Sequence, residues 1–361
     1  MGAERACDRC LAHSWLLARL TGHLDVVRGQ IGSVLGLPDQ ELIAAVAGRQ
    51  RTVVTRELSE LDIGALRDAA VGADLQLICR CDPGYPERLA VSSSAPAVLN
   101  VAGDLERFLG LLSADPVAIV GARRPSAYGL ELARFLGHGL GCAGITVLSG
   151  MALGIDSAAH SGALAAGAAT VAVLPGGADR PYPPSKHALH RQIVARGAAI
   201  SELPAGSKAR RWTFPARNRI IAGLSAMTIV VEAGERSGAL ITAEFARGLD
   251  RPVGAVPGRV SSPLSCGPNG LLAGGAHVVR GPQDVLDQLF GAGVRAAQRS
   301  ERPKLTSELH VLLRAVADGH DTTGALARAG FPVEPSLAAL AALELSGYVR
   351  RGPGGRWVVL P

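Results

Sequence analysis

Between residues 117 and 290, short apolar runs rich in β-branched residues alternate with longer stretches of helical character. Strands that are apolar on both faces and separated by helices are typical of a parallel sheet with helices on each side. The order therefore predicts an α/β fold, a doubly wound and mostly parallel Rossmann-like sheet. The expected strands are 117–120, 145–148, 170–174, 198–200, 227–231, 253–256 and 277–279.

The region before this sheet has a different pattern. Residues 1–73 carry apolar side chains at helical spacing, with glycines between the helices, which predicts a small helical domain of the helix-hairpin-helix or SAM-like type. A helical interaction module fits the region equally well. Two further strands, expected at 75–79 and 96–101, open an extended Rossmann-like domain over 74–290.

Residues 291–304 are small, polar and basic, as is typical of a linker. Helices expected over 307–317, 323–328 and 335–346, followed by a hairpin, predict a winged-helix-like domain over 305–361. The third of these helices is nearly all Ala and Leu, whereas major-groove reading uses Arg, Lys, Asn or Gln. An accessory or protein-contacting role is therefore expected for this domain.

The formal net charge of +6 favours an anionic partner such as nucleic acid without requiring one. No apolar run reaches the ~18 residues that a bilayer-spanning helix needs. The segment Met1–Leu20 carries Glu4 and Asp8 and lacks the layout of a signal peptide. A cytoplasmic protein with no membrane partner is expected.

Cysteine usage leaves two interpretations open. Two close pairs occur, Cys7-x-x-Cys10 and Cys79-x-Cys81, and disulfides are not expected in a cytoplasmic chain. A zinc site with four thiolates would require both pairs to meet in space. Because Cys-x-Cys is not a usual zinc-knuckle spacing, separate buried thiols are favoured, and neither a metal nor a cofactor is expected.

The loops that follow the expected strands hold the candidate site, because ligands of open α/β sheets bind beyond the carboxyl ends of the strands. Segments 121–129, 149–156, 175–179 and 232–242 are rich in Gly and small hydroxyl residues, and each leads into a helix. Glycines let a ligand approach the backbone, and helix N-termini offer free N–H groups. Each loop alone could be an ordinary tight turn, but four on one edge predict an anion site.

Missing motifs narrow the choice of anion. Neither G-x-G-x-x-G after the strand at 117–120 nor G-x-x-x-x-G-K-[ST] occurs, so no nicotinamide, flavin or ATP site is expected. The segment 208–219 instead places five basic residues around Trp212 and Phe214. Such segments suit single-stranded nucleic acid, whose bases stack on rings while its phosphates meet Arg or Lys. A solvated loop with both rings in the core fits this composition equally well.

These motifs together resemble the DprA/Smf family of DNA-processing proteins. The longest match is the run Phe214-Pro-Ala-Arg-Asn-Arg-Ile-Ile-Ala-Gly-Leu-Ser225. Gly121-Ala-Arg123, Ser149-Gly150 with Gly154-Ile-Asp156, and Ser237-Gly238 with Thr242 occur in the same order as in the family. The resemblance covers residues 110–290, roughly half of the chain.

The resemblance implies a non-enzymatic protein of natural transformation and recombination. Such a protein binds and protects incoming single-stranded DNA, helps to load the recombinase RecA, and forms a homodimer through its Rossmann-like domain. Leu153 stands where the family usually carries a basic residue, and Arg124 or Arg236 could supply that phosphate contact. The expected DNA-binding residues are Gly121, Arg123, Ser126, Tyr128, Ser149, Gly150, Gly154, Lys208, Arg210, Phe214, Arg217, Asn218, Arg219, Ser237, Gly238 and Thr242.

Several polar residues of these motifs have two interpretations. Of Arg217 and Arg219, one is expected to bind DNA while the other braces the loop, and Asn218 is expected to cap a helix rather than to read a base. Asp156 and His160 lie four residues apart. They are expected to act as a helix cap and its neighbour rather than as an acid–base pair.

Two other classes of function remain open. Nucleotide N-glycosidases on similar sheets carry P-G-G-x-G-T-x-x-E, whereas this chain has Pro175-Gly176-Gly177 followed by Ala-Asp-Arg. Glu232, after a buried strand, is expected to organise loop N–H groups rather than to catalyse a reaction. The third class is a scaffold that acts mainly through protein partners.

Overall fold

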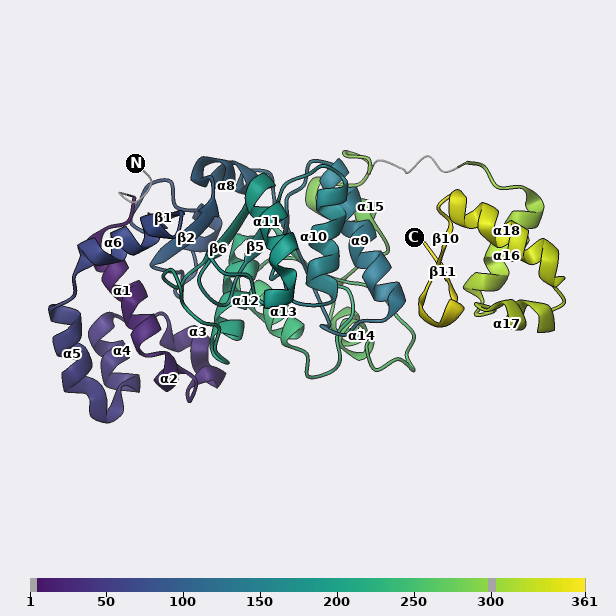
Figure 1. The fold of residues 1–361 in the computed structure, drawn as a ribbon. Coiled ribbons are helices and arrows are strands. Elements are labelled where there is room, and N and C mark those ends of the chain that lie inside the picture. Colours follow the sequence, from purple (N-terminus) through teal and green to yellow (C-terminus); the bar gives the residue numbers. More distant parts are fainter. Residues whose placement is uncertain (1–4, 298–302, 361) are drawn as a thin grey trace.

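The computed structural model describes residues 5–297 and 303–360, so parts of the expected linker and both chain ends lie outside the described residues. Figure 1 shows a central sheet with helices packed on both faces. Helices α1–α6 lie at one end of this sheet, and helices α16–α18 lie at the other. No helix within these two ranges is both long and apolar enough to cross a membrane.

The sheet contains nine strands in the described residues, in the order β1-β2-β6-β5-β4-β3-β7-β8-β9. Each neighbouring pair from β6 to β9 is parallel, whereas β2 runs antiparallel to both β6 and β1. The predicted α/β class with a mostly parallel sheet is therefore confirmed. The strands are β1 Leu75–Cys79, β2 Val98–Gly103, β3 Val117–Val120, β4 Val147–Ser149, β5 Thr170–Val173, β6 Ala198–Ser201, β7 Met227–Val230, β8 Val253–Ala255 and β9 His277–Val278.

The chain enters the parallel sheet at its centre, in β3. It then adds β4, β5 and β6 outward on one side, and returns to add β7, β8 and β9 on the other. The direction of winding thus reverses between β3 and β7, which pair in register from Val117 opposite Met227 to Val120 opposite Val230. Such a topological switch point leaves a crevice beyond the strand ends, where doubly wound proteins bind their ligands.

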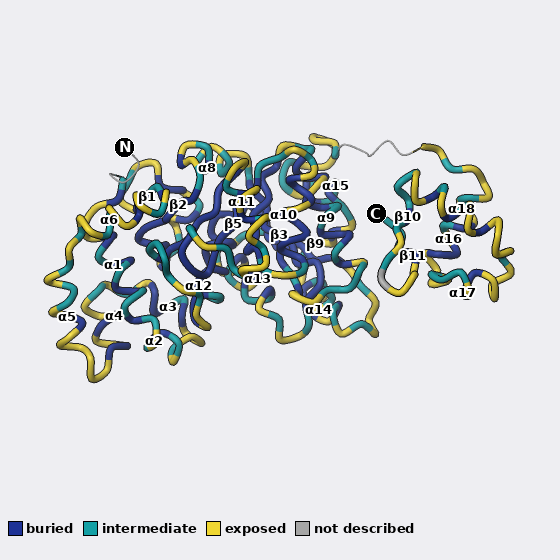
Figure 2. Tube along the Cα trace, in the orientation of Figure 1, coloured by how far each residue is buried: buried dark blue, intermediate teal, exposed yellow. Residues whose placement is uncertain are grey.

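Two layers of helices cover the parallel strands. Val117 and Ile119 of β3 pack with α9 (Ala127–Cys142) and α10 (Ile155–Ala165). Ala118 and Val120 point to the opposite face, toward α12 (Thr213–Leu224) and α13 (Gly238–Gly248). Successive residues of a strand face opposite sides, and both sides of β3 are covered, as the uninterrupted apolar run predicted. Figure 2 shows the buried residues concentrated along these strands.

The remaining helices of the sheet unit are shorter or lie at its edges. They are α7 Glu87–Ala90, α8 Leu105–Leu112, α11 His187–Arg196, α14 Cys266–Ala273 and α15 Pro282–Phe290. Helices α7, α8 and α14 were not predicted from the sequence. In α14, Gly267, Pro268 and Gly270 conceal the helix, because glycine and proline are typical of loops.

The N-terminal region is helical, as predicted. The apolar spacing predicts one helix over 58–69, but this range is divided between α5, which ends at Ser59, and α6, which begins at Ile63. Asp62 separates them because its carboxylate accepts a hydrogen bond from the Ala65 N–H and caps the second helix. The core of this region also contains Leu203 and Trp212, so its helices pack directly on the sheet unit. The helices are α1 Asp8–Arg19, α2 Thr21–Leu24, α3 Ile31–Val34, α4 Asp39–Val46, α5 Arg51–Ser59 and α6 Ile63–Gly72.

The C-terminal region has three helices followed by a two-stranded hairpin, in the predicted order. They are α16 Ser307–Ala317, α17 Thr323–Arg328, α18 Val333–Leu345, β10 Val349–Arg351 and β11 Trp357–Val359. Leu312, Leu326 and Leu340 form its core with Trp357. Arg350 of the hairpin forms an ion pair with Glu131 on α9, so this arginine contacts the sheet unit.

Helix α12 begins earlier than the sequence indicated. The sequence pattern predicts a helix over 216–224, after Pro215, but the helix starts at Thr213. Proline fits the first turn of a helix, because the N–H groups of that turn have no partner within the helix. Asn218 therefore lies inside α12, and the expectation that it caps the helix is wrong.

Candidate functional site

A cavity of about 210 Å³ opens at the switch point, between the end of β3 and the N-terminal turns of α12 and α13. The structure brings eight of the predicted site residues together here, although they come from segments far apart in the sequence. The eight that line the cavity are Gly121, Arg123, Phe214, Arg217, Asn218, Ser237, Gly238 and Thr242. We call this cavity the switch-point pocket.

Arg123 and Phe214 form one wall of the switch-point pocket. The Arg123 guanidinium lies 4.9 Å from the centroid of the Phe214 ring, and its side chain is exposed. Tyr182 packs edge-on against the same ring, with the centroids 5.3 Å apart. A cation over an aromatic face is attracted by the ring quadrupole, so the ring orients the exposed guanidinium. The wall thus offers a positive charge beside an aromatic surface.

Arg217 forms the floor of the switch-point pocket and is only 7% exposed. Its Nη1 donates to the Val173 carbonyl at 3.0 Å, and its Nε donates to Asn218 Oδ1 at 3.1 Å. Burial lowers the pKa of the guanidinium, while the nearby carboxylate of Asp156 opposes that shift. Arg217 is therefore held by the protein and braces the site. Because Arg219 is buried and paired as well, the structure does not divide these two arginines into one that binds DNA and one that braces the loop.

Gly150 makes the position of Arg217 sterically possible. A Cβ atom at residue 150 would lie 1.4 Å from Arg217 Nη1, much closer than any non-bonded contact allows. Gly154 has a similar role in the same loop. It adopts a left-handed backbone with φ of 82°, and a Cβ there would meet the Ala122 carbonyl oxygen at 2.3 Å. Both glycines serve close packing at the strand ends.

Asp156 stabilises the loop before α10 and is buried. Its Oδ2 accepts hydrogen bonds from the N–H groups of Gly150 at 3.2 Å and Ala152 at 3.4 Å. Burial raises the pKa of Asp156, and the charge of Arg217 acts in the opposite direction. The expectation that Asp156 caps the helix is wrong, because the N-cap of α10 is Gly154 and Asp156 lies inside the helix, where it accepts N–H groups of the preceding loop.

His160 makes its hydrogen bond with a different partner. Its Nδ1 lies 2.8 Å from Thr170 Oγ1, inside the core. Burial, together with the charge of Arg217, lowers the pKa of His160 to about 3, so the ring is neutral near pH 7. A neutral imidazole bonded to a threonine hydroxyl supports the structural interpretation over the acid–base pair.

Glu232 organises the turn before α9, as expected. Its Oε2 accepts a hydrogen bond from the Ser126 N–H at 2.8 Å, and its Oε1 accepts one from the Ser126 hydroxyl at 2.6 Å. The Ser126 oxygen in turn accepts from the Gly129 N–H at 3.1 Å, which caps the helix. A protein carboxylate thus already interacts with the N-terminus of α9.

The N-terminus of α13 lies directly in the switch-point pocket. Ser237 caps this helix through the Ala239 N–H at 3.4 Å, and the side chain of Asn218 donates to the Gly238 carbonyl at 3.0 Å. A Cβ atom at Gly238 would meet nothing within 4 Å, so the space above this backbone is open. The first turn of α13 can therefore be approached by an anion, which its partial positive charge favours.

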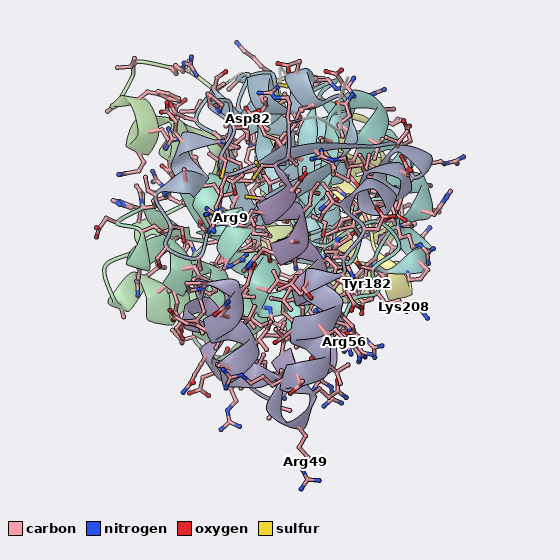
Figure 3. All side chains as sticks on the ribbon, turned by 90° about the vertical axis from the view of Figure 1, so that its left-hand side faces the viewer. Arg9, Arg49, Arg56, Asp82, Tyr182 and Lys208 are labelled. Carbon is pink, nitrogen blue, oxygen red and sulfur yellow. The ribbon has the colours of Figure 1, made fainter. Side chains whose placement is uncertain are left out.

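The other predicted site residues lie outside the cavity lining. Ser149 is fully buried, with its hydroxyl donating to the Ile119 carbonyl at 2.6 Å. Arg219 is 3% exposed, pairs with Glu202 and donates to the Ala216 carbonyl. Lys208, Arg210 and Tyr128 are exposed. Figure 3 shows Lys208 and Tyr182 near one edge of that view.

The positions of two aromatic side chains near the pocket were not predicted from the sequence. Tyr182 was not singled out, because it lies in a proline-rich loop after β5 and no motif marks it. Trp212 was grouped with Phe214, but its ring is completely buried and its Nε1 donates to Thr21 Oγ1 at 2.8 Å. The only available signal for Tyr182 was its place in a loop at the ligand-binding edge of the sheet.

Comparison with known sequences places the pocket inside a family match. Residues 76–290 match the family of DNA recombination-mediator protein A. Protein Smf of Synechocystis is 41% identical over 214 residues, covering 59% of this chain and 54% of that protein. This chain therefore spans about half the length of that relative. Protein Smf of Escherichia coli is 35% identical over 280 residues, which cover 75% of this chain and 74% of that protein.

Two solved structures resemble this one. DNA processing protein A of Streptococcus pneumoniae has a TM-score of 0.63 and 32% identity, covering 78% of this chain and 96% of that one. DNA processing protein A of Helicobacter pylori, described with a unique single-stranded DNA binding mode, has a TM-score of 0.52 and 30% identity. That match covers 57% of this chain and 92% of the other. On the family match and these relatives, this chain belongs to the DNA recombination-mediator protein A family, which includes proteins named DprA and Smf.

Proposed function

We propose that this chain binds single-stranded DNA at the switch-point pocket. As a recombination mediator it would protect incoming DNA and help to load a RecA-type recombinase in natural transformation. The observation that carries the proposal is the exposed Arg123 guanidinium held over the Phe214 ring in the lining of the pocket. The guanidinium can meet a phosphate while a base stacks on a nearby ring. Family membership and the single-strand binding of the Helicobacter pylori relative support the same ligand.

The size of the pocket favours a single strand over a duplex. About 210 Å³ admits one phosphate or one splayed base, but not a base-paired helix. Single-strand recognition uses unstacked bases and backbone phosphates, which such a pocket can take one at a time. The exposed Lys208 and Arg210 would then attract neighbouring phosphates.

The predicted site residues divide into two proposed roles. The first group would contact DNA directly and includes those with accessible atoms: Gly121, Arg123, Tyr128, Lys208, Arg210, Phe214, Ser237 and Gly238. The second group would shape the pocket from beneath and includes Ser126, Ser149, Gly150, Gly154, Arg217, Asn218, Arg219 and Thr242. Leu153 is exposed, and the exposed Arg124 or Arg236 would replace the basic residue that stands there in the family.

The proposed action is binding without bond cleavage. Asp156 is the carboxylate in the lining of the switch-point pocket, and its Oδ2 already accepts two backbone N–H groups. A general base must reach the proton that it removes, and this carboxylate is buried beneath the loop. The incomplete glycosidase motif at Pro175–Gly177 agrees with this proposal.

The state of the protein in the cell is also a proposal. Family membership supports a cytoplasmic homodimer formed through the Rossmann-like domain, so light scattering should give twice the chain mass of 37.1 kDa. A mass of one chain at micromolar concentration would contradict the dimer. Limited proteolysis between residues 291 and 304 should separate the proposed 305–361 domain from the proposed domains 1–73 and 74–290, which remain joined.

The central test compares two arginine variants. Arg123→Ala should weaken binding of oligo-dT roughly 10- to 100-fold, since a hydrogen bond to a charged group contributes about 1.5–3 kcal/mol. It should also reduce the slope of log affinity against log salt by about 0.7, the value for one phosphate of a single strand. Arg49→Ala makes the same change in charge at the tip of the N-terminal helices (Figure 3), outside the lining of the pocket, and should change neither value.

Fluorescence anisotropy of labelled oligo-dT at two salt concentrations measures both quantities. A duplex of the same length should bind more weakly to the wild type than oligo-dT does. Equal affinity of Arg123→Ala and Arg49→Ala for oligo-dT would contradict the proposed pocket. Release of a base from a nucleoside monophosphate, absent in the Arg123→Ala variant, would contradict the non-enzymatic role.

A further inference from the structure

Four cysteines converge where the N-terminal segment crosses the antiparallel edge of the sheet. The Sγ atoms of Cys7, Cys10, Cys79 and Cys81 all lie within 4.8 Å of one another. Cys7 and Cys10 belong to the first turn of α1, while Cys79 ends β1 and Cys81 follows in the next turn. The two pairs therefore meet in space, and the favoured prediction of separate buried thiols is wrong. We call this group the cysteine cluster.

The spacing of the sulfur atoms fits a tetrahedral metal site. Zinc–thiolate bonds of about 2.3 Å place tetrahedrally arranged sulfurs about 3.8 Å apart. The Sγ atoms of Cys10 and Cys81 are 3.7 Å apart, so this pair already has the required distance. A disulfide needs about 2.0 Å between its sulfurs, and all four cysteines are free. Small movements of the remaining two side chains would complete the tetrahedron.

Neighbouring groups would stabilise the charge of such a site. Four thiolates around one Zn²⁺ carry a net charge of −2. In the sequence, Arg9 lies between Cys7 and Cys10, and Arg80 lies between Cys79 and Cys81. The Cys7 N–H donates to Cys79 Sγ at 3.4 Å, and such a hydrogen bond stabilises a thiolate. Cys10 and Cys79 are almost fully buried, at 1% and 2% exposure, so bulk water has little access to their sulfurs.

The backbone around the cysteine cluster is held in place from both sides. The Cys79 N–H donates to the Arg5 carbonyl at 3.0 Å, which aligns the N-terminal segment with the end of β1. The Arg5 side chain donates twice to Asp82, at 2.9 and 3.1 Å, and so fixes the turn that carries Cys81. The cluster is therefore preorganised by contacts that do not involve the sulfurs, as a specific metal site requires.

We propose that the cysteine cluster binds one zinc ion, which ties the first helix to the edge strand β1. The choice of zinc follows from the ligand set, since a closed site with four thiolate ligands is typical of structural zinc. The site stands apart from DNA binding. Four strands lie between β1 and β3, which places the cluster roughly 24 Å from the switch-point pocket at the usual strand spacing.

The first test is the metal content of the full chain, purified without chelators or a metal-affinity step. Inductively coupled plasma mass spectrometry should find about one zinc per chain. Cys79→Ser with Cys81→Ser should abolish it, whereas Cys142→Ser with Cys266→Ser should retain it, because those two cysteines lie outside the cluster. A wild-type chain that holds no zinc, even after addition of one equivalent and gel filtration, would overturn the proposal.

A second measurement does not depend on the folding of a variant. Cobalt exchanged into the wild-type chain should give the visible absorption of a tetrahedral site and an intense sulfur-to-cobalt charge-transfer band. The same protein loaded with zinc should expose only two cysteines, Cys142 and Cys266, to a thiol reagent, and chelation should expose the other four. Iron in place of zinc, or an intramolecular disulfide in the freshly purified chain, would contradict the zinc assignment.

Discussion

The switch-point pocket and the cysteine cluster are built in opposite ways. The pocket is formed by loops and helix starts that follow β3, β4, β6 and β7, so the winding of the sheet brings its residues to one edge. The cluster joins two segments about 70 residues apart, and it exists only because α1 packs against β1. In the pocket, buried polar groups support exposed ones that line the cavity. In the cluster, the four side chains face one another.

This difference separates function from stability. A change in the pocket should alter DNA affinity, while a change in the cysteine cluster should alter the free energy of unfolding with little effect on affinity. Sites that lie well apart and share no partners usually act independently. We therefore expect mutations in the two regions to have separate effects on DNA affinity and on stability.

The largest expected effect is the loss of the metal. If the cysteine cluster holds zinc at about 1,000 times its dissociation constant, zinc stabilises the folded chain by about 4 kcal/mol. Chelation should then lower Tm by about 8–16 °C, at 2–4 °C for each kcal/mol in a domain of this size. Differential scanning fluorimetry with and without a chelator measures this shift, and added zinc should reverse it.

The same chelated sample tests the separation of the two regions. Below its Tm, it should bind oligo-dT within about twofold of the zinc-loaded protein, since distant sites usually act additively. A tenfold loss of affinity on chelation would show that the cysteine cluster and the switch-point pocket are coupled. The Cys142→Ser/Cys266→Ser variant should keep the full response to the chelator.

The second effect is steric and lies in the pocket. Gly150→Ala places a Cβ atom on the Arg217 guanidinium, so that side chain must move and the lining with it. Overpacking a well-packed site costs about 1–3 kcal/mol, and oligo-dT affinity should fall by up to about 100-fold. Gly110→Ala, in the middle of α8 with nothing within 4 Å of the added Cβ, is the matched control and should bind normally.

The Gly150→Ala result depends on Arg217 being held in one position. Isothermal titration with oligo-dT, together with Tm, separates a loss of binding from a loss of folding. Wild-type affinity in Gly150→Ala would mean that the floor of the pocket can rearrange, and that Arg217 does not shape the site. The zinc content of this variant should be unchanged, because the cysteine cluster lies at the β1 edge of the sheet, and four strands separate β1 from β3.

The third effect concerns the aromatic wall. Phe214→Ala removes the ring that lies under Arg123 and beside Tyr182. Stacking contributes about 1–3 kcal/mol per base, so a loss of about tenfold in oligo-dT affinity is expected, with an unchanged salt slope. Phe290→Ala removes a ring that pairs with Arg295 in the same way, at 4.3 Å, but far along the chain on α15. That control should leave affinity unchanged, and equal losses in both variants would contradict base stacking at Phe214.

The two regions also show what the sequence can reveal. The alternation of apolar runs and helices predicted the sheet, and the rule for strand ends then placed the loops of Gly121, Ser149 and Ser237 at one edge. Glu232 was expected to hold N–H groups, and it does so at Ser126. These features follow from the order of strands and helices and from the chemistry of neighbouring residues, and both can be read from the sequence.

The cysteine cluster could not be predicted in this way. Its two pairs are each visible in the sequence, but their meeting depends on how α1 packs on β1, which no local pattern encodes. The segment 208–219 shows the same limit. Its composition is uniform, yet Trp212 is buried against Thr21 and Arg219 is paired with Glu202, while Lys208 remains exposed. Tertiary partners decide which of these side chains can meet DNA.

The smallest expected effect tests the exposed part of that segment. Lys208→Ala with Arg210→Ala removes two charged side chains that are exposed to solvent. Oligo-dT affinity should therefore fall only about threefold to tenfold at low salt. The slope of log affinity against log salt should decrease by about 1.4, at 0.7 for each phosphate contact of a single strand. Arg49→Ala with Arg56→Ala is the control with the same change in charge, on the N-terminal helices (Figure 3).

The comparison of the two double variants decides how far the DNA path extends. A net loss of two positive charges weakens binding to any polyanion slightly, so only the difference between the variants reports a specific contact. If Lys208→Ala/Arg210→Ala changes the salt slope more than Arg49→Ala/Arg56→Ala does, the strand leaves the switch-point pocket along the 208–210 segment. If both double variants change the salt slope equally, the DNA strand leaves the pocket by another route. In the 208–219 segment, only the residues that line the pocket would then contact DNA.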